Sequence, residues 1–219
     1  MAERRRRRPR TRFGVVGELV LLVLVVVLAT TMVRTFLVAP FSIPSGSMEQ
    51  TLHVGDRILV DRLSYRFHDV RRGDIVVFDG TEAFGRLGTG KGETDYVKRV
   101  IGLPGDHVQS LGTGPNGDTG VVRVNGKPLD ESAYLYPGEA GSDGAFSVDV
   151  PAGHLWLMGD HRADSLDSRA HTGQPGGGMV PIDKVLGRVM VVVWPLDRVG
   201  RVPDSGLSDA PPGSAAGHR

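Results

Sequence analysis

Three separated segments of the chain carry residues that could perform covalent catalysis. Ser47 lies in the stretch Pro-Ser-Gly-Ser-Met, Lys98 lies in a mostly apolar stretch that ends in a Gly-Leu-Pro-Gly-Asp turn, and Ser165 lies within the charged segment 159–169. A serine hydroxyl becomes a strong nucleophile only when a base removes its proton, and a neutral lysine amine can be that base. The three segments together predict a Ser/Lys dyad in which a second serine holds the lysine amine.

Lys98 can act as a base only if its environment lowers its pKa. An ordinary lysine has a pKa near ~10.4, so roughly one molecule in 2,500 is neutral at pH 7, and a base needs a loss of about three pH units. The apolar neighbours Tyr96 and Val97 suit the burial that would cause this loss. Strand alternation sends Lys98 and Arg99 to opposite faces, so we expect one in the site and the other in water. The alternative is an exposed Lys-Arg pair on an edge strand.

The residues around Ser47 suit a tight turn that presents a nucleophile. Pro44 restricts the backbone and Gly46 frees it, and Ser45 stands two residues before Ser47. The Ser45 hydroxyl and the Ser47 N–H could therefore donate hydrogen bonds to a developing oxyanion. The alternative is a simple turn with no catalytic role.

Segment 159–169 is dense in opposite charges. We expect bidentate pairs of carboxylates and guanidiniums to fix this loop, with Asp160, Arg162, Asp167 and Arg169 as the bracing groups. A metal site of Asp160, Asp164 and Asp167 is an alternative, although it lacks the regular ligand spacing of a calcium loop. His161 also leaves an ordinary Ser-His-Asp arrangement open.

Bulk properties narrow the class of protein. The chain has 219 residues, a net charge of +1 and no cysteine, so nothing points to nucleic acid as a partner, and disulfides and thiolate chemistry are excluded. Residues 15–33 form one apolar segment of membrane-spanning length behind the basic tail 1–14, which predicts a single anchor with a cytoplasmic N-terminus. A cleavable signal peptide is the alternative.

Beyond the anchor, the sequence predicts a mainly β fold. Short runs of β-type residues alternate with Gly, Pro and Asp turns, at 57–61, 74–78, 96–101, 121–124, 154–158 and 188–194. Asn125-Gly126 is a strong hairpin signal. We expect exposed loops at 80–93, 112–120, 136–143 and 173–178. Residues 34–202 are predicted to be an extracytoplasmic catalytic domain, and the Ser-, Gly-, Ala- and Pro-rich residues 203–219 a disordered tail.

In their order and content, these segments resemble bacterial type I signal peptidase, with a Gram-positive or actinobacterial character. Residues 43–48 match the family's nucleophile segment, 73–78 a strand segment, 96–106 the lysine segment and 159–169 the last segment. The resemblance implies that Ser47 is the nucleophile, Ser45 the oxyanion donor, Lys98 the base and Ser165 the partner of the lysine amine. His161, Ala163 and Asp164 depart from the usual family residues.

The same resemblance implies a β-rich signal-peptidase fold that needs no cofactor and no metal. The expected substrates are signal peptides of secreted preproteins, bound extended, and the expected partners are the phospholipid membrane and the secretion translocon. Small residues at positions −1 and −3 would enter shallow apolar pockets formed by Phe41, Ile43, Leu52, Ile58, Tyr96 and Val97; ordinary core packing is the alternative for each. Two rivals are a self-cleaving Ser/Lys regulator and an inactive membrane-tethered β domain.

Overall fold

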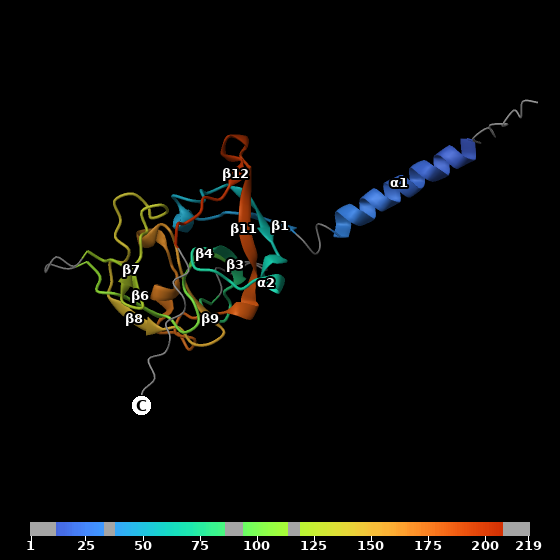
Figure 1. Ribbon diagram of the computed structural model, residues 1–219. Coiled ribbons are helices and arrows are strands. Elements are labelled where there is room, and N and C mark those ends of the chain that lie inside the picture. The colour runs from blue at the N-terminus through green and yellow to red at the C-terminus, as the bar shows by residue number, and fades with distance from the viewer. Residues whose placement is uncertain (1–11, 33–37, 86–93, 114–118, 208–219) are drawn as a thin grey trace, which may run out of the picture. The chain divides into compact units, whose positions relative to one another are not determined.

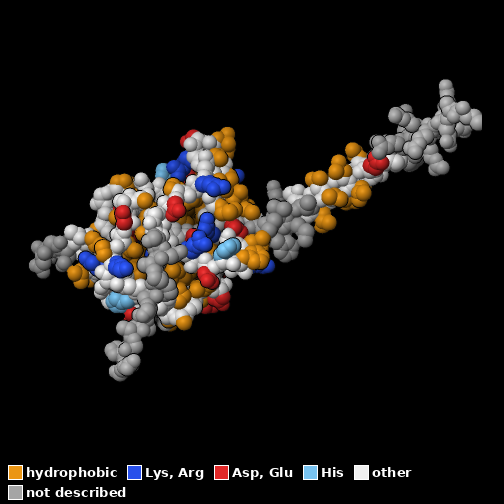
Figure 2. All heavy atoms as spheres, viewed as in Figure 1, with side chains coloured by type: hydrophobic (Ala, Val, Ile, Leu, Met, Phe, Trp, Pro, Cys, Tyr) orange, Lys and Arg blue, Asp and Glu red, His pale blue; other side chains and the backbone are white. Residues whose placement is uncertain are grey.

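The computed structural model describes residues 12–32, 38–85, 94–113 and 119–207. The chain divides into two compact units, Met1–Val38 and Ala39–Arg219. The first unit contains helix α1 (Arg12–Met32), whose described side chains are exposed and largely apolar (Figures 1 and 2). Among the described residues, no helix meets the length and apolarity required to cross a membrane. Membrane spanning by residues 15–33 therefore stays a prediction.

The second unit is built mainly from antiparallel strands, as the alternating sequence pattern predicts (Figure 1). Its larger sheet has the strand order β1-β2-β11-β3-β4-β9-β10, with β12 paired to β11. The bounds of these strands are β1 Val38–Ser42, β2 Arg57–Asp61, β3 Ile75–Asp79, β4 Asp95–Gly102, β9 His154–Met158, β10 Val180–Pro181, β11 Val185–Trp194 and β12 Gly200–Arg201.

A smaller sheet has the strand order β7-β6-β5-β8. Its strands are β5 His107–Ser110, β6 Arg123–Val124, β7 Lys127–Pro128 and β8 Phe146–Asp149. Asn125 and Gly126 join β6 to β7 with positive φ angles of 53° and 78°. The left-handed backbone at both positions is that of a two-residue hairpin turn, which confirms the sequence signal.

Short helices connect the strands. They are α2 Ser64–Phe67 and the 3₁₀ turns η2 Gly46–Met48, η3 Arg162–Asp164, η4 Ser168–His171, η5 Ile182–Lys184 and η6 Leu196–Arg198. Three of these turns, η2, η3 and η4, contain predicted site residues, so the site is formed by connections supported by the large sheet.

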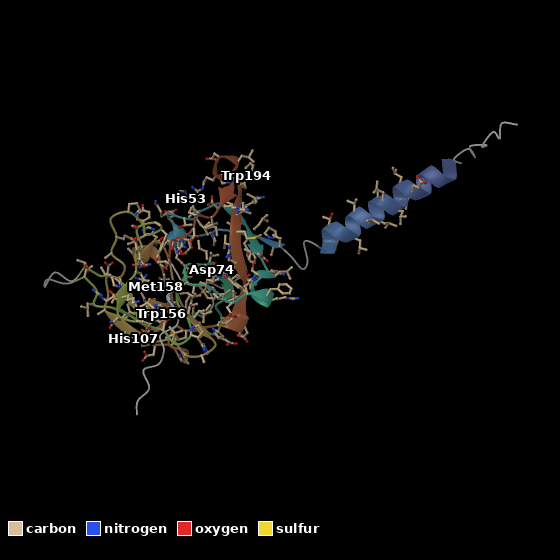
Figure 3. All side chains as sticks on the ribbon, in the orientation of Figure 1. His53, Asp74, His107, Trp156, Met158 and Trp194 are labelled. Atoms are coloured by element: carbon tan, nitrogen blue, oxygen red, sulfur yellow. The ribbon has the colours of Figure 1, made fainter. Side chains whose placement is uncertain are left out.

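The core covers both faces of the central strand β4. Phe78, Tyr96 and Leu157 belong to one buried cluster, while Ile58, Val60 and Val77 belong to another. Trp156 and Met158 of β9 lie in a third cluster beside the small sheet (Figure 3). β4 pairs with β3 along residues 95–99 and with β9 from Arg99 onward, so the strand that carries Lys98 is fixed within the large sheet.

Two predicted loop or tail regions differ from expectation. Ala83 and Phe84 are buried in the core, because Phe84 packs edge-on against both Phe78 and Tyr96, so residues 80–93 are not exposed throughout. Residues 203–207 are placed against the domain, with Ser205 buried beside Gly73. Residues 86–93, 114–118 and 208–219, which belong to predicted loops and the predicted tail, lie outside the described residues.

Candidate active site

Ser47 and Lys98 meet although 51 residues separate them in the chain. The Lys98 Nζ atom donates a hydrogen bond of 2.6 Å to Ser47 Oγ. Both residues are buried, with 7% of Ser47 and 4% of Lys98 exposed. A serine hydroxyl held on a shielded lysine amine has the geometry needed for proton removal by that amine.

Burial has the effect on Lys98 that catalysis by a base requires. Desolvation lowers the pKa of Lys98 to about 8, against the opposing charges of Asp167, Asp160 and Asp164. At pH 7 roughly one Lys98 side chain in ten is then neutral, several hundred times more than for an ordinary lysine. The three carboxylates stabilise the protonated Lys98 amine, so its pKa does not fall by the full three pH units that the sequence argument required.

The turn that carries Ser47 is short and crowded. Ser47 is in the first turn of η2, where its N–H has no acceptor within the helix and can serve a substrate oxygen. The Ser45 and Ser47 Oγ atoms are 3.4 Å apart. A side chain at Gly46 would come within 3.1 Å of an Asp164 carboxylate oxygen, so this position suits glycine. The predicted oxyanion donors thus lie beside the nucleophile.

Segment 159–169 contacts the nucleophile turn from the other side. The His161 N–H donates a 3.2 Å hydrogen bond to the Ser47 carbonyl oxygen. Position 159 has no room for a side chain, because a Cβ there would clash with Ser165 and with the Ser47 carbonyl oxygen. The buried Ser165 Oγ forms no hydrogen bond with the Lys98 amine, although Ser165 helps to lower the pKa of the neighbouring Asp167. Its role with the lysine amine stays a prediction.

Arg99 corrects one expectation. We expected the Arg99 side chain to lie in water, on the face of the strand opposite Lys98. It is instead buried, with 1% of its surface exposed. Its Nε and Nη2 atoms each donate a 2.7 Å bond to the Asp160 carboxylate, which also accepts a 2.5 Å bond from Thr51. The guanidinium also stacks on Tyr134, 4.2 Å from the ring centre. Sequence reasoning predicted Asp160 as a bracing group but named neither Arg99 nor Thr51 as its partner.

The other predicted bracing groups also form buried pairs. Arg162 makes a bidentate pair with Glu131, at 2.5 and 3.2 Å, a partner that sequence reasoning missed. Arg169 donates two bonds to Asp167, which also accepts the Gly159 N–H. Burial alone would raise the pKa of Asp167, but the hydrogen bonds and charge of Arg169 hold that pKa below its usual range. The Asp167 carboxylate therefore fixes the loop as an anion.

The metal and histidine alternatives do not fit this arrangement. Among residues 12–32, 38–85, 94–113 and 119–207, no group of three or more acidic, histidine or cysteine side chains could hold a metal. The His161 ring stacks on Tyr136 with centres 4.0 Å apart, and its Nε2 atom lies 3.2 Å from Glu139. Of the possible bases among the described residues, it is the Lys98 amine that hydrogen-bonds the Ser47 hydroxyl.

A mainly apolar cleft of about 460 Å³ leads to the dyad. It is lined by Phe41, Ser42, Ile43, Pro44, Ser45, Ser47, Met48, Val77, Asp95, Tyr96, Val97 and Lys98. Four of the six predicted pocket residues are among them. Leu52 and Ile58 are fully buried in the core and do not line the cleft, so core packing accounts for both. Val77 was missed; its register opposite Val97 brings it to the cleft.

Comparisons with known proteins identify the family of this chain. A family model described as signal peptidase, peptidase S26, matches residues 16–194. The chain is 39% identical to a signal peptidase I of Mycobacterium tuberculosis (strain ATCC 25618 / H37Rv), over 84% of this chain and 74% of that protein. It is 37% identical to a probable signal peptidase I of Mycobacterium leprae, over 77% and 72%, and 33% identical to a signal peptidase I of Bacillus licheniformis, over 83% and 90%.

These matches place the chain in the peptidase S26 family of signal peptidases, and its enzyme class is serine endopeptidase. The resemblance that the sequence suggested, including its actinobacterial character, is confirmed. A solved signal peptidase I from Enterococcus faecalis V583 matches at 24% identity with a TM-score of 0.38, over 55% of this chain and 97% of that one.

Proposed function

We propose that this chain is a membrane-bound serine endopeptidase that removes signal peptides from translocated preproteins with a Ser47/Lys98 dyad. The observation that supports the dyad best is the 2.6 Å hydrogen bond between the Lys98 amine and the Ser47 hydroxyl, at the end of an apolar cleft. Signal peptidase I relatives at 33–39% identity support the choice of substrate.

The first chemical step is acylation of Ser47. Neutral Lys98 takes the hydroxyl proton as Ser47 Oγ attacks the scissile carbonyl carbon. The carbonyl oxygen becomes an oxyanion that accepts hydrogen bonds from the Ser47 N–H and the Ser45 hydroxyl. The C–N bond breaks, Lys98 gives its proton to the leaving amine, and the signal peptide remains as an ester on Ser47.

The second step regenerates the enzyme. Lys98, neutral again, removes a proton from water as the water oxygen attacks the ester carbon. The bond from that carbon to Ser47 Oγ breaks, the serine regains a proton from Lys98, and the signal peptide leaves with a new carboxylate. Every proton transfer uses the one amine, so no cofactor enters the scheme.

The substrate would bind as an added strand. Residues 95–98 of β4 pair with β3 on one side, whereas β9 pairs with β4 only from Arg99 onward. Among the described strands, none occupies the edge of 95–98 that faces the cleft. An extended peptide on such an edge gains backbone hydrogen bonds, while alternate side chains enter pockets. Phe41, Ile43, Tyr96 and Val97 would then limit positions −1 and −3 to small residues.

The membrane is proposed as the second partner, and the secretion translocon as the third. Residues 15–33 would span the bilayer with residues 1–14 in the cytoplasm and the catalytic domain outside. Trp194, Leu196 and Val199 expose large apolar side chains around the end of β11 (Figure 3), where they could contact the outer leaflet. An interfacial tryptophan is suited to such contact.

A preprotein cleavage assay tests the proposal. The full-length enzyme in phospholipid vesicles should convert a preprotein into a mature protein, and mass spectrometry should locate the cut after a small residue with a second small residue at −3. The matched Ser47→Ala enzyme should leave the preprotein intact. Equal processing by both enzymes would overturn the assignment of the nucleophile, and no processing by the wild type would overturn the proposed activity.

A further inference from the structure

Two charged residues line the apolar cleft, and one of them has no function in the chemistry described above. Lys98 stands at the end beside Ser47, and Asp95 lines the cleft where β4 begins. All the other lining residues are uncharged at neutral pH. A single carboxylate in a mainly apolar groove is the kind of group that fixes which side chain is accepted there.

The strand geometry places Asp95 away from the reacting atoms. Three residues separate it from Lys98 along β4, which corresponds to about 10 Å at ~3.3 Å per residue. A peptide laid along the open edge of residues 95–98, with its scissile bond at Ser47, would pass Asp95 beyond the residues that fill the pockets at −1 and −3. Asp95 therefore faces the part of a signal peptide just before position −3.

Among the described residues, the charges that act on Asp95 are those of one carboxylate, Asp79, and one guanidinium, Arg62. Asp79 is its direct partner in the register of β3 and β4, which puts two carboxylates opposite each other. No ion pair joins Asp95 to another residue of the described chain, although the charge of Arg62 opposes the repulsion. Burial and then the charge of Asp79 raise the pKa of Asp95. A cation brought by a substrate would relieve this repulsion, and an anion would add to it.

We propose that Asp95 selects substrates by charge, favouring Lys or Arg and disfavouring Asp or Glu at positions −4 and −5 of the signal peptide. This inference rests on the proposed function, because it assumes that the cleft binds the residues before the scissile bond. Asp95 is exposed to solvent, so water screens the interaction. We expect kcat/KM to change about two- to fivefold between a lysine and a glutamine substrate, with a similar penalty for glutamate.

A charge-swap experiment tests the inference. Three peptides that differ only in Lys, Gln or Glu at −4, with a second set changed at −5, are cleaved by wild type, Asp95→Asn and Asp95→Lys. The wild type should prefer Lys over Gln over Glu, Asp95→Asn should show nearly equal values, and Asp95→Lys should reverse the order. Asp143→Lys, at an exposed aspartate outside the cleft, is the matched control and should keep the wild-type order.

Two readouts separate this specificity from a change in stability or in the chemistry. Ratios between substrates cancel any loss of active enzyme, and the preference should shrink as salt is raised. The same ratios in wild type and Asp95→Lys would overturn the inference while leaving the proposed function intact. Failure of the wild type to cleave the neutral glutamine peptides would overturn both.

Discussion

Lys98 shows how two opposing effects set the chemistry of one side chain. Its burial removes water from the amine and lowers the pKa to about 8, while the carboxylates of Asp167, Asp160 and Asp164 favour the charged form. Complete desolvation without these anions would give a stronger drop in pKa but would leave the loop that holds Ser47 unbraced. The site therefore combines an ionisable base with the ion pairs that keep it in place.

Replacing Lys98 should remove activity for a chemical reason. Lys98→Ala and Lys98→Arg should both reduce preprotein processing to the level of Ser47→Ala, because alanine has no base and a guanidinium stays protonated. Rates should be measured on purified enzymes whose folding is checked by circular dichroism. If Lys98→Ala keeps substantial activity and His161→Ala loses it, the base is histidine and the dyad is wrong.

The pH dependence should report the pKa of Lys98. Since only the neutral amine can take the Ser47 proton, kcat/KM should rise about tenfold per pH unit below pH 8 and level off above it. Asp164 is exposed and its charge raises the pKa of Lys98, so Asp164→Asn should move the rising limb to lower pH. Asp143→Asn is the control at a distant exposed aspartate. A rate that is flat from pH 6 to 9 would exclude Lys98 as the titrating base.

At the scale of elements, β4 and the connection after β9 are joined by a buried ion pair. Arg99 lies in β4, and its side chain forms an ion pair with Asp160, two residues after the end of β9. Asp160 also accepts from Thr51, just beyond η2, so one carboxylate links three segments. The nucleophile turn, the base strand and the bracing loop are therefore fixed to one another by a single charged group.

Breaking this pair should destabilise the domain strongly. Arg99→Leu leaves Asp160 buried without its main partner, and such a change costs about 3–5 kcal/mol of unfolding free energy. Urea unfolding of the domain gives the measurement, with Arg66→Leu as a control at an exposed arginine. The double variant Arg99→Leu with Asp160→Leu should recover part of the loss. Similar midpoints for Arg99→Leu and Arg66→Leu would contradict the structural importance of the pair.

The elements differ in how far the sequence predicts them. Local signals such as Asn125-Gly126 predicted a hairpin, and two strands, 57–61 and 154–158, have the predicted bounds. Arg99 and Asp160 are 61 positions apart in the sequence, and Arg162 and Glu131 are 31 apart. Local sequence patterns do not predict pairs that are so widely separated. For the same reason Leu52 and Ile58 look like pocket residues in the sequence but pack inside the core.

For the whole molecule, the proposed function gives the N-terminal segment the task of anchoring the enzyme at the membrane. Residues 1–38 form a compact unit of their own, and every described member of the proposed site belongs to the unit that begins at Ala39. The catalytic chemistry needs nothing from the N-terminal unit, whereas access to preproteins as they leave the membrane depends on it in the proposed function.

Anchoring has a direct chemical test. N-terminal sequencing of the membrane-extracted protein should show that residues 15–33 are retained, and a shortened chain that begins near Thr35 should still cleave soluble peptides. It should process vesicle-bound preproteins less well, because it no longer shares their membrane. A mature protein that starts at Thr30 would identify residues 15–29 as part of a cleaved signal peptide and contradict the anchor.

Lys98 and Arg99 are neighbours in one strand but differ in how they hold their protons. The proposed mechanism requires Lys98 to be neutral, whereas the Arg99 guanidinium stays protonated. Asp160 raises the pKa of Lys98, and Arg99 contacts that same carboxylate at 2.7 Å. The permanent charge of Arg99 therefore weakens the hold of Asp160 on the Lys98 proton. An enzyme that kept its fold but lost this guanidinium would work best in more alkaline surroundings. A residue away from the reacting atoms would thus help to set the pH at which the proposed peptidase works.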